Sequence, residues 1–219
     1  MREVFQQELR EVQTRLVEIA DLVEQTVQQA TTAFGTSDVA LAEQVIDGAE
    51  RIDHLAGELD TLTVDILARQ QPVASDLRLM VGSLRMSASL ERMADLAQHI
   101  AQLARYRYPE SAIPEGLRKT FAKMGAIDVK MAGKIVDLLR HQDPKLIEQI
   151  RDLDDDLDRL HVKVFEKVLS EKVQLDGPTS VVDATLASRY HERFADHAVS
   201  IAKKVQYLAT GDWAGSDDN

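Results

Sequence analysis

The sequence contains no cysteine and is poor in residues that interrupt helices. Its 219 residues include five prolines, ten glycines and only 5% aromatic residues. The lack of cysteine excludes a disulfide framework and a thiolate metal site. So few breakers predict few turns and long elements. Together with an apolar content carried by Ala, Val, Leu and Ile, this favours helices over a β-sandwich or a barrel.

Long hydrophobic runs and a positive charge balance are also missing. No segment approaches the roughly 18 apolar residues of a transmembrane helix. The polar first eight residues are not followed by the apolar region of a signal peptide. A formal net charge of −11 repels the phosphate backbone of nucleic acids. We therefore expect a cytoplasmic protein that does not bind nucleic acid and reaches the inner face of a membrane only through a partner.

The few breakers that are present divide the chain into six long helices. At the sharpest break, Asp143 suits the N-cap and Pro144 the first helical position, and Pro114 suits the same position one helix earlier. The predicted helices span residues 2–34, 38–70, 74–107, 114–141, 144–173 and 179–209. In the third, a 3.6-residue period predicts a core stripe of Leu79, Met86, Leu90, Met93, Ala97, Ile100 and Ala104.

An internal repeat organises these helices. The run Glu91-Arg92-Met93-Ala94-Asp95 returns as Glu192-Arg193-Phe194-Ala195-Asp196, shifted by 101 residues, and Ile52-Asp53 returns as Leu157-Asp158. The sequence therefore predicts an all-α fold of two tandem three-helix bundles, with six long antiparallel helices. The predicted repeats span residues 1–107 and 114–210, and residues 211–219 are expected to form a disordered acidic tail.

Carboxylates gather in the repeated segments. Glu91 and Asp95 are four residues apart and share one helix face, and Glu192 and Asp196 repeat this spacing. The preceding helices offer further acids, namely Asp47, Glu50 and Asp53 in the first half and Asp152, Asp154, Asp155 and Asp158 in the second. Convergent carboxylates suit Mg²⁺, Mn²⁺ or iron. We interpret these acids as candidate cation ligands. The alternative is an acidic stripe that is exposed to solvent and pairs with Arg92 or Arg193.

The pattern leaves two other classes of protein open. A carboxylate-bridged di-iron enzyme needs Glu-x-x-His twice, whereas this chain offers only Asp158-x-x-His161. A plain helical interaction module, with its carboxylates merely solvated, is the third interpretation. No Walker motif, nucleophile elbow or His-Glu-x-x-His motif occurs, so we predict that the protein is not an enzyme. Arg78, Arg105 and Arg107 are the predicted partner-binding residues.

Two features carry a resemblance to a known family. The run Pro72-Val73-Ala74-Ser75-Asp76-Leu77-Arg78 is similar to the entry into the third helix of PhoU proteins, and the segments at 91–97 and 192–198 resemble that family's two signature segments. The resemblance covers about residues 1–210 and is nearest to actinobacterial members. It implies two three-helix bundles side by side, and metal clusters on the Glu/Asp-x-x-x-Asp motifs of some members.

The resemblance also implies a role. PhoU proteins are negative regulators of the phosphate response, whose partners are a phosphate-sensing histidine kinase and the ATPase subunit of the phosphate ABC transporter. A homodimer is a further expected assembly, since long bundles with leftover apolar stripes often dimerise. The chain departs from the family pattern at one position, where Ala49 stands in place of the acid that Asp154 supplies in the second half. A cation site is therefore predicted more strongly for the second half than for the first.

Overall fold

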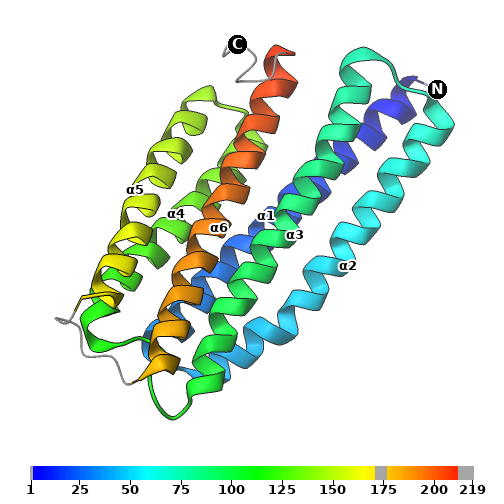
Figure 1. Ribbon diagram of the computed structural model, residues 1–219. Coiled ribbons are helices and arrows are strands. Elements are labelled where there is room, and N and C mark those ends of the chain that lie inside the picture. Colours follow the sequence, from blue (N-terminus) through cyan, green and yellow to red (C-terminus); the bar gives the residue numbers. More distant parts are fainter. Residues whose placement is uncertain (1, 171–176, 212–219) are drawn as a thin grey trace.

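The protein is a pair of three-helix bundles lying side by side (Figure 1). The computed structural model describes residues 2–170 and 177–211. Within these ranges it contains no strand, one short 3-10 helix and six α-helices, which are α1 (Arg2–Thr36), α2 (Val39–Gln70), α3 (Ala74–Arg107), η1 (Glu115–Leu117), α4 (Arg118–His141), α5 (Pro144–Val168) and α6 (Pro178–Thr210). The predicted all-α architecture of two tandem bundles is confirmed.

Two helix starts and one helix end follow from capping residues seen in the sequence. The carboxylate of Asp38 accepts a hydrogen bond from the backbone N–H of Leu41 at 3.0 Å, and Asp143 accepts one from Lys145 at 3.0 Å. Both caps satisfy a backbone donor that has no partner within the helix. At the other end of the last helix, Gly211 takes a left-handed conformation with φ of 80°, which glycine adopts without steric cost.

Two predicted boundaries were wrong. The fourth helix does not begin at Pro114, which is extended (ψ 143°) and precedes η1, so that the α-helix begins only at Arg118. The fifth helix ends at Val168 rather than at 173, because Leu169 is 84% exposed and finds nothing to pack against. Apart from Gly211, the predicted acidic tail lies outside the described residues.

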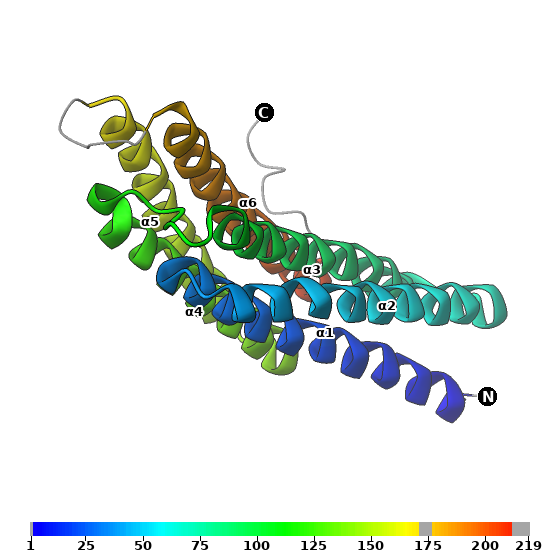
Figure 2. The ribbon, with the colours of Figure 1, turned by 90° about the horizontal axis from the view of Figure 1, so that it is seen from below.

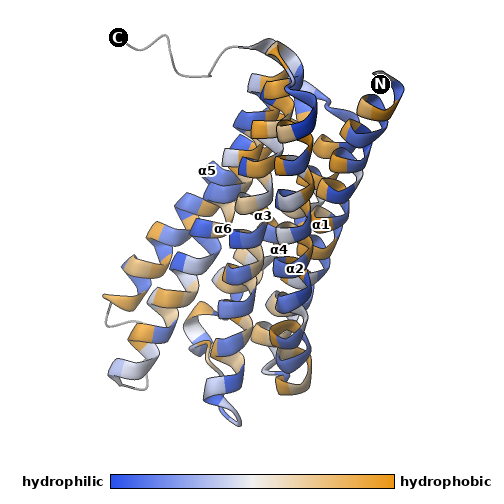
Figure 3. Cartoon of the chain, turned by 90° about the vertical axis from the view of Figure 1, so that its right-hand side faces the viewer, coloured by the Kyte–Doolittle hydropathy of each residue, from blue (hydrophilic) through white to orange (hydrophobic). Residues whose placement is uncertain are grey.

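Helix α3 carries the predicted core stripe. Six of its seven predicted core residues are buried, and Leu79 is half-buried at the edge of the core. The helix packs on α1 and α2 of its own bundle and also on α6 of the other. Hydrophobic and hydrophilic residues alternate along the helices in Figure 3, as expected for amphipathic helices that bury one stripe in a shared core.

The two bundles meet through α1 against α4 and α3 against α6 (Figure 2). Glycines permit the close approach. A Cβ on Gly125 of α4 would lie 3.0 Å from Cβ of Thr31, and one on Gly82 of α3 would lie 3.1 Å from Leu208. Arg140 of α4 adds an ion pair to Asp21 of α1 at 2.6 Å. Within the described part of the chain, no helix is long and apolar enough to cross a membrane.

Candidate functional site

Acidic side chains of α2 and α3 form a first carboxylate cluster. Burial raises the pKa of Asp53 above its ordinary value, and the negative charges of Asp95 and Glu50 raise it further. Burial likewise raises the pKa of Glu91, with added repulsion from Asp53, Asp95 and Asp60 and a smaller opposing effect of a neighbouring arginine. The structure therefore brings together carboxylates that the sequence predicted as a set, and adds Asp60 to them.

A second carboxylate cluster occupies the equivalent place between α5 and α6. Burial raises the pKa of Asp154 to about 6, and the charges of Asp158, Asp196, Asp155 and Glu192 contribute to the rise. Burial also raises the pKa of Glu192, helped by Asp196. One oxygen of Glu192, Oε2, is buried and has no hydrogen-bond partner. Burial and neighbouring negative charge therefore act together on the carboxyls of this cluster.

Arginines neutralise part of each cluster. Arg92 lies 2.8 Å from Asp95, three residues further along α3. In the second half the pairing differs, because Arg189 rather than the predicted Arg193 forms an ion pair, and its partner is Glu192. Each arginine pairs with only one carboxylate of its cluster, and an ion pair with a solvent-exposed arginine contributes little net stability. The repulsion among the remaining carboxylates is therefore not removed.

The sequence difference between the halves falls at a buried position of α2. Ala49 is buried at 5% exposure where Asp154 stands in the other half, and Glu50 borders the first cluster instead. Asp47 and Asp152 are exposed, and neither is among the charges that raise the pKa values of the clustered carboxyls. These two therefore stand apart from the other predicted cation ligands.

Carboxylate oxygens have the right chemistry for a hard cation. Among the described residues, no three His, Asp or Glu side chains stand close enough together to hold a metal ion. Binding of Mg²⁺, Mn²⁺ or iron therefore stays a prediction, which elemental analysis of protein purified without chelator will check. The side chain of His161, which the sequence offered as part of a possible di-iron motif, makes other contacts. Its Nδ1 lies 2.8 Å from Ser188 Oγ and its ring packs edge-on against Phe165.

Neutralising Asp154 is expected to stabilise the protein at alkaline pH. The pKa of Asp154 is raised to about 6 in the folded state and has its ordinary value of about 4 in the unfolded state. Ionisation of this carboxyl therefore lowers the free energy of unfolding as the pH rises from about 4 through 6. The side chain is only half-buried, and screening by solvent reduces the effect of Asp154→Asn to about 1 kcal/mol at pH 8. Thermal unfolding in chelator should show the gain at pH 8 and its loss at pH 4.

Asp152→Asn is the matched control for this measurement. Asp152 is exposed on the same helix, so its substitution is expected to change stability by less than about 0.5 kcal/mol at either pH. A melting temperature of Asp154→Asn below that of the unmodified protein at pH 8 would show that the Asp154 carboxylate is stabilised rather than strained by its neighbours.

The three predicted partner-binding arginines have different surroundings. Arg107 forms a two-pronged ion pair with the buried carboxylate of Asp183, so it joins the end of α3 to α6. Arg105 is exposed and its guanidinium lies 5.4 Å from the ring centre of Tyr106. Arg78 lines a groove between the start of α3 and the end of α6. Arg105 is therefore exposed, whereas Arg78 and Arg107 are both half-buried, and Arg107 is in addition tied to Asp183.

A buried acid–imidazole pair was missed from the sequence. Asp128 of α4 and His191 of α6 are 0% and 1% exposed, and Oδ2 of the aspartate lies 2.5 Å from Nδ1 of the histidine. Burial raises the pKa of Asp128 to about 6, against the lowering effect of His191. One signal was available, because Asp128 follows Met124 by four residues on a face that is otherwise apolar.

Comparison with known proteins identifies relatives over nearly the whole chain. The family model of the PhoU domain matches twice, over residues 16–104 and 121–205. Phosphate-specific transport system accessory protein PhoU homolog 2 of Mycobacterium tuberculosis is 40% identical over 211 residues, which cover 96% of this chain and 99% of that protein. Homolog 1 of Mycobacterium leprae is 37% identical over 217 residues, covering 99% and 97%. The predicted actinobacterial resemblance is confirmed.

Solved structures agree with this assignment. The crystal structure of PhoU from Pseudomonas aeruginosa matches with a TM-score of 0.88 and 31% sequence identity, over 95% of this chain and all of that one. The phosphate transport system regulatory protein PhoU from Streptococcus pneumoniae matches with a TM-score of 0.83 at 21% identity, which shows the shared fold.

Proposed function

The chain belongs to the PhoU family, and on that premise we propose that it is an accessory protein of phosphate-specific transport that restrains phosphate uptake and the phosphate-starvation response. It acts as a non-catalytic adaptor between the ATPase subunit of the phosphate ABC transporter and the phosphate-sensing histidine kinase. Its place is the cytoplasmic face of the membrane, where it is held by these partners.

One observation carries the proposal. Relatives that are 40% identical over 211 residues, and are matched over 99% of their length, are named accessory proteins of the phosphate-specific transport system. Likeness over a whole chain supports a shared role better than likeness over one motif does. The absence of any Walker motif, nucleophile elbow or His-Glu-x-x-His motif from the sequence supports an adaptor rather than an enzyme.

A cationic groove offers a surface for a partner. We call it the α3–α6 groove; its volume is about 310 Å³ and its walls are Leu77, Arg78, Val81, Gly82, Arg85, Lys204 and Tyr207. Burial lowers the pKa of Lys204, and the charge of Arg85 lowers it further. Leu77 and Val81 are large apolar side chains that are 42% and 38% exposed. Positive charge beside exposed apolar surface, in a chain of net charge −11, suits an acidic partner segment with apolar side chains.

Reversing the charge of Arg78 is expected to weaken partner binding at least about tenfold. The acidic segment would then meet a carboxylate inside the groove, and like charges at an interface cost several kcal/mol. Tagged Arg78→Glu protein should recover correspondingly less transporter ATPase or kinase from solubilised membranes. The control is Arg51→Glu on α2, an exposed position outside the groove with the same change in net charge. Equal recovery with both variants would exclude the groove as the docking surface.

Deletion of the gene tests the proposal as a whole. In cells grown at high phosphate, we expect the phosphate-starvation genes to be expressed without the protein and repressed again when it is restored. Normal repression in the deletion strain would overturn the regulatory role. Co-purification of the native protein from membranes, with identification of the kinase and the ATPase, tests the adaptor mechanism separately.

A further inference from the structure

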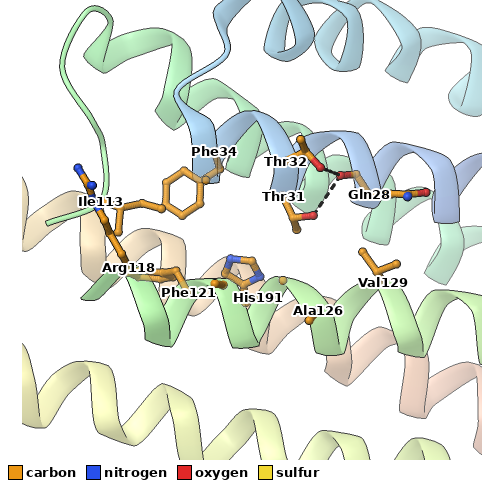
Figure 4. A pocket seen from close by; sticks show the side chains of 13 residues that line it. Gln28, Thr31, Thr32, Phe34, Ile113, Arg118, Phe121, Ala126, Val129 and His191 are labelled. Carbon is orange, nitrogen blue, oxygen red and sulfur yellow. Dashed lines mark hydrogen bonds between the residues drawn. The ribbon is translucent and has the colours of Figure 1, made fainter. Parts of the chain in front are cut away.

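A pocket of about 380 Å³ opens between α1 and α4, with the imidazole of His191 in its wall (Figure 4). Segment 28–35 of α1 forms one side, and residues 118–129 of α4 together with Ile113 form the other. The Nε2 atom of His191 is buried and has no hydrogen-bond partner. A buried polar atom without a partner costs free energy, and here it belongs to a residue that lines a pocket large enough for a small molecule.

The pairing with Asp128 determines what Nε2 offers. A buried pair that carries a net charge is strongly disfavoured, so the pair is neutral overall. In one neutral state Asp128 is ionised and both imidazole nitrogens of His191 carry hydrogen. In a second, Asp128 carries the shared proton and the hydrogen of the neutral imidazole is on Nε2. A third neutral state, with hydrogen on Asp128 Oδ1 and on His191 Nδ1, would bury an O–H donor that has no acceptor, because Oδ1 has no partner either. In the two states without that buried O–H, Nε2 carries hydrogen and is a donor that lacks an acceptor.

The rest of the wall is mainly apolar and aromatic. The rings of Phe34 and Phe121 lie 5.5 Å apart and edge to face, and each ring centre is about 6 Å from that of His191. The hydroxyls of Thr31 and Thr32 donate to backbone carbonyls of their own helix at 2.8 Å, so their hydrogens are used. The one cationic side chain in the wall, Arg118, extends toward Ile113 and away from His191 (Figure 4), so an anion at Nε2 would add a negative charge beside Asp128 with no cation next to it. This favours a neutral acceptor on a flat, apolar body.

We propose that this pocket binds a small planar heteroaromatic molecule that presents a neutral ring nitrogen or carbonyl oxygen to His191 Nε2. The ring of the ligand packs against Phe34 and Phe121, and its acceptor takes the hydrogen bond that the protein leaves unmade. The pocket lies between α1 of one bundle and α4 of the other, so the ligand contacts both halves of the chain.

Two isosteric probes test the proposal. 7-Azaindole and indole have the same shape, but only 7-azaindole carries a ring nitrogen that accepts a hydrogen bond. We expect 7-azaindole to bind about tenfold more tightly, the upper range for one neutral hydrogen bond, and to shift the ¹⁵N signal of His191 Nε2. Equal affinities, or a His191 signal that neither probe moves, would overturn the proposal and leave a structural acid–imidazole pair.

A variant that fills the pocket locates the site without altering the pair. Ala126 is exposed and lines the pocket from α4, so Ala126→Leu is expected to abolish binding of 7-azaindole. Ala40→Leu, an equal enlargement at an exposed position of α2 outside the pocket, is expected to bind like the unmodified protein. Undiminished binding by Ala126→Leu would show that the probe binds elsewhere.

Discussion

Replacing His191 with alanine is expected to lower the free energy of unfolding by about 3–5 kcal/mol at pH 7, because the substitution leaves Asp128 buried without its partner. The carboxyl would also lose the interaction that lowers its pKa, so it would titrate above the value of about 6 that it has beside His191. Protonating the isolated, buried carboxyl costs little free energy at acidic pH, whereas at alkaline pH it costs much more. The deficit should therefore be smaller at pH 5 than at pH 8, as measured by urea unfolding.

The double variant distinguishes a coupled pair from two independent core residues. Asp128→Ala combined with His191→Ala removes both polar groups, so no buried charge remains. We expect the double variant to lose less stability than the sum of the two single losses, by at least about 1 kcal/mol. Strict additivity would show that the two side chains contribute through packing alone.

Replacing Phe194 with alanine is expected to cost about 3–5 kcal/mol, the usual range for a fully buried aromatic residue. Its repeat counterpart Met93 is equally buried, and Met93→Ala should cost about 2–5 kcal/mol. Since the bundles pack through α1 on α4 and α3 on α6, both variants should lower the midpoint of one cooperative transition. Calorimetry checks this directly.

Arg193→Ala is the control, because this neighbouring side chain is exposed and should change stability by less than about 0.5 kcal/mol. Two calorimetric transitions, of which Met93→Ala moves one and Phe194→Ala the other, would contradict the single cooperative unit. That result would mean that the helix contacts between the bundles are too weak to couple their unfolding.

Local signals predicted the helices well, and they failed where tertiary contacts set a boundary. Asp143 caps the helix that it was expected to cap, and Asp38 caps α2 in the same way, since a carboxyl bonded to a backbone N–H two or three residues away depends on nothing distant. The end of α5 at Val168 depended instead on whether the next side chains had anything to pack against. Nothing in the local pattern shows that Leu169 faces solvent.

The candidate site divides in the same way. Spacing of four residues placed Glu192 and Asp196 on one helix face, and the repeat placed Asp154 and Asp158 on the helix beside it, so most of the second cluster was predictable. The repeat pointed to Arg193, whereas Arg189, three residues before Glu192, forms the ion pair with it. Such pairings depend on the side-chain rotamers, which helical phase does not specify.

Composition, breakers, apolar period and the 101-residue repeat determined the fold class, and the run at 72–78 with the two repeated segments carried the family resemblance. Each of these depends on residues close together or on comparison of one half with the other. Only the tertiary structure paired Asp128 with His191, which lie 63 residues apart on helices that meet inside the second bundle. Helical phase indicates which face of a helix is buried, but not which helix lies opposite or what it presents. The partner of a buried polar group, and the pocket beside it, therefore exist only once α1, α4 and α6 are packed together.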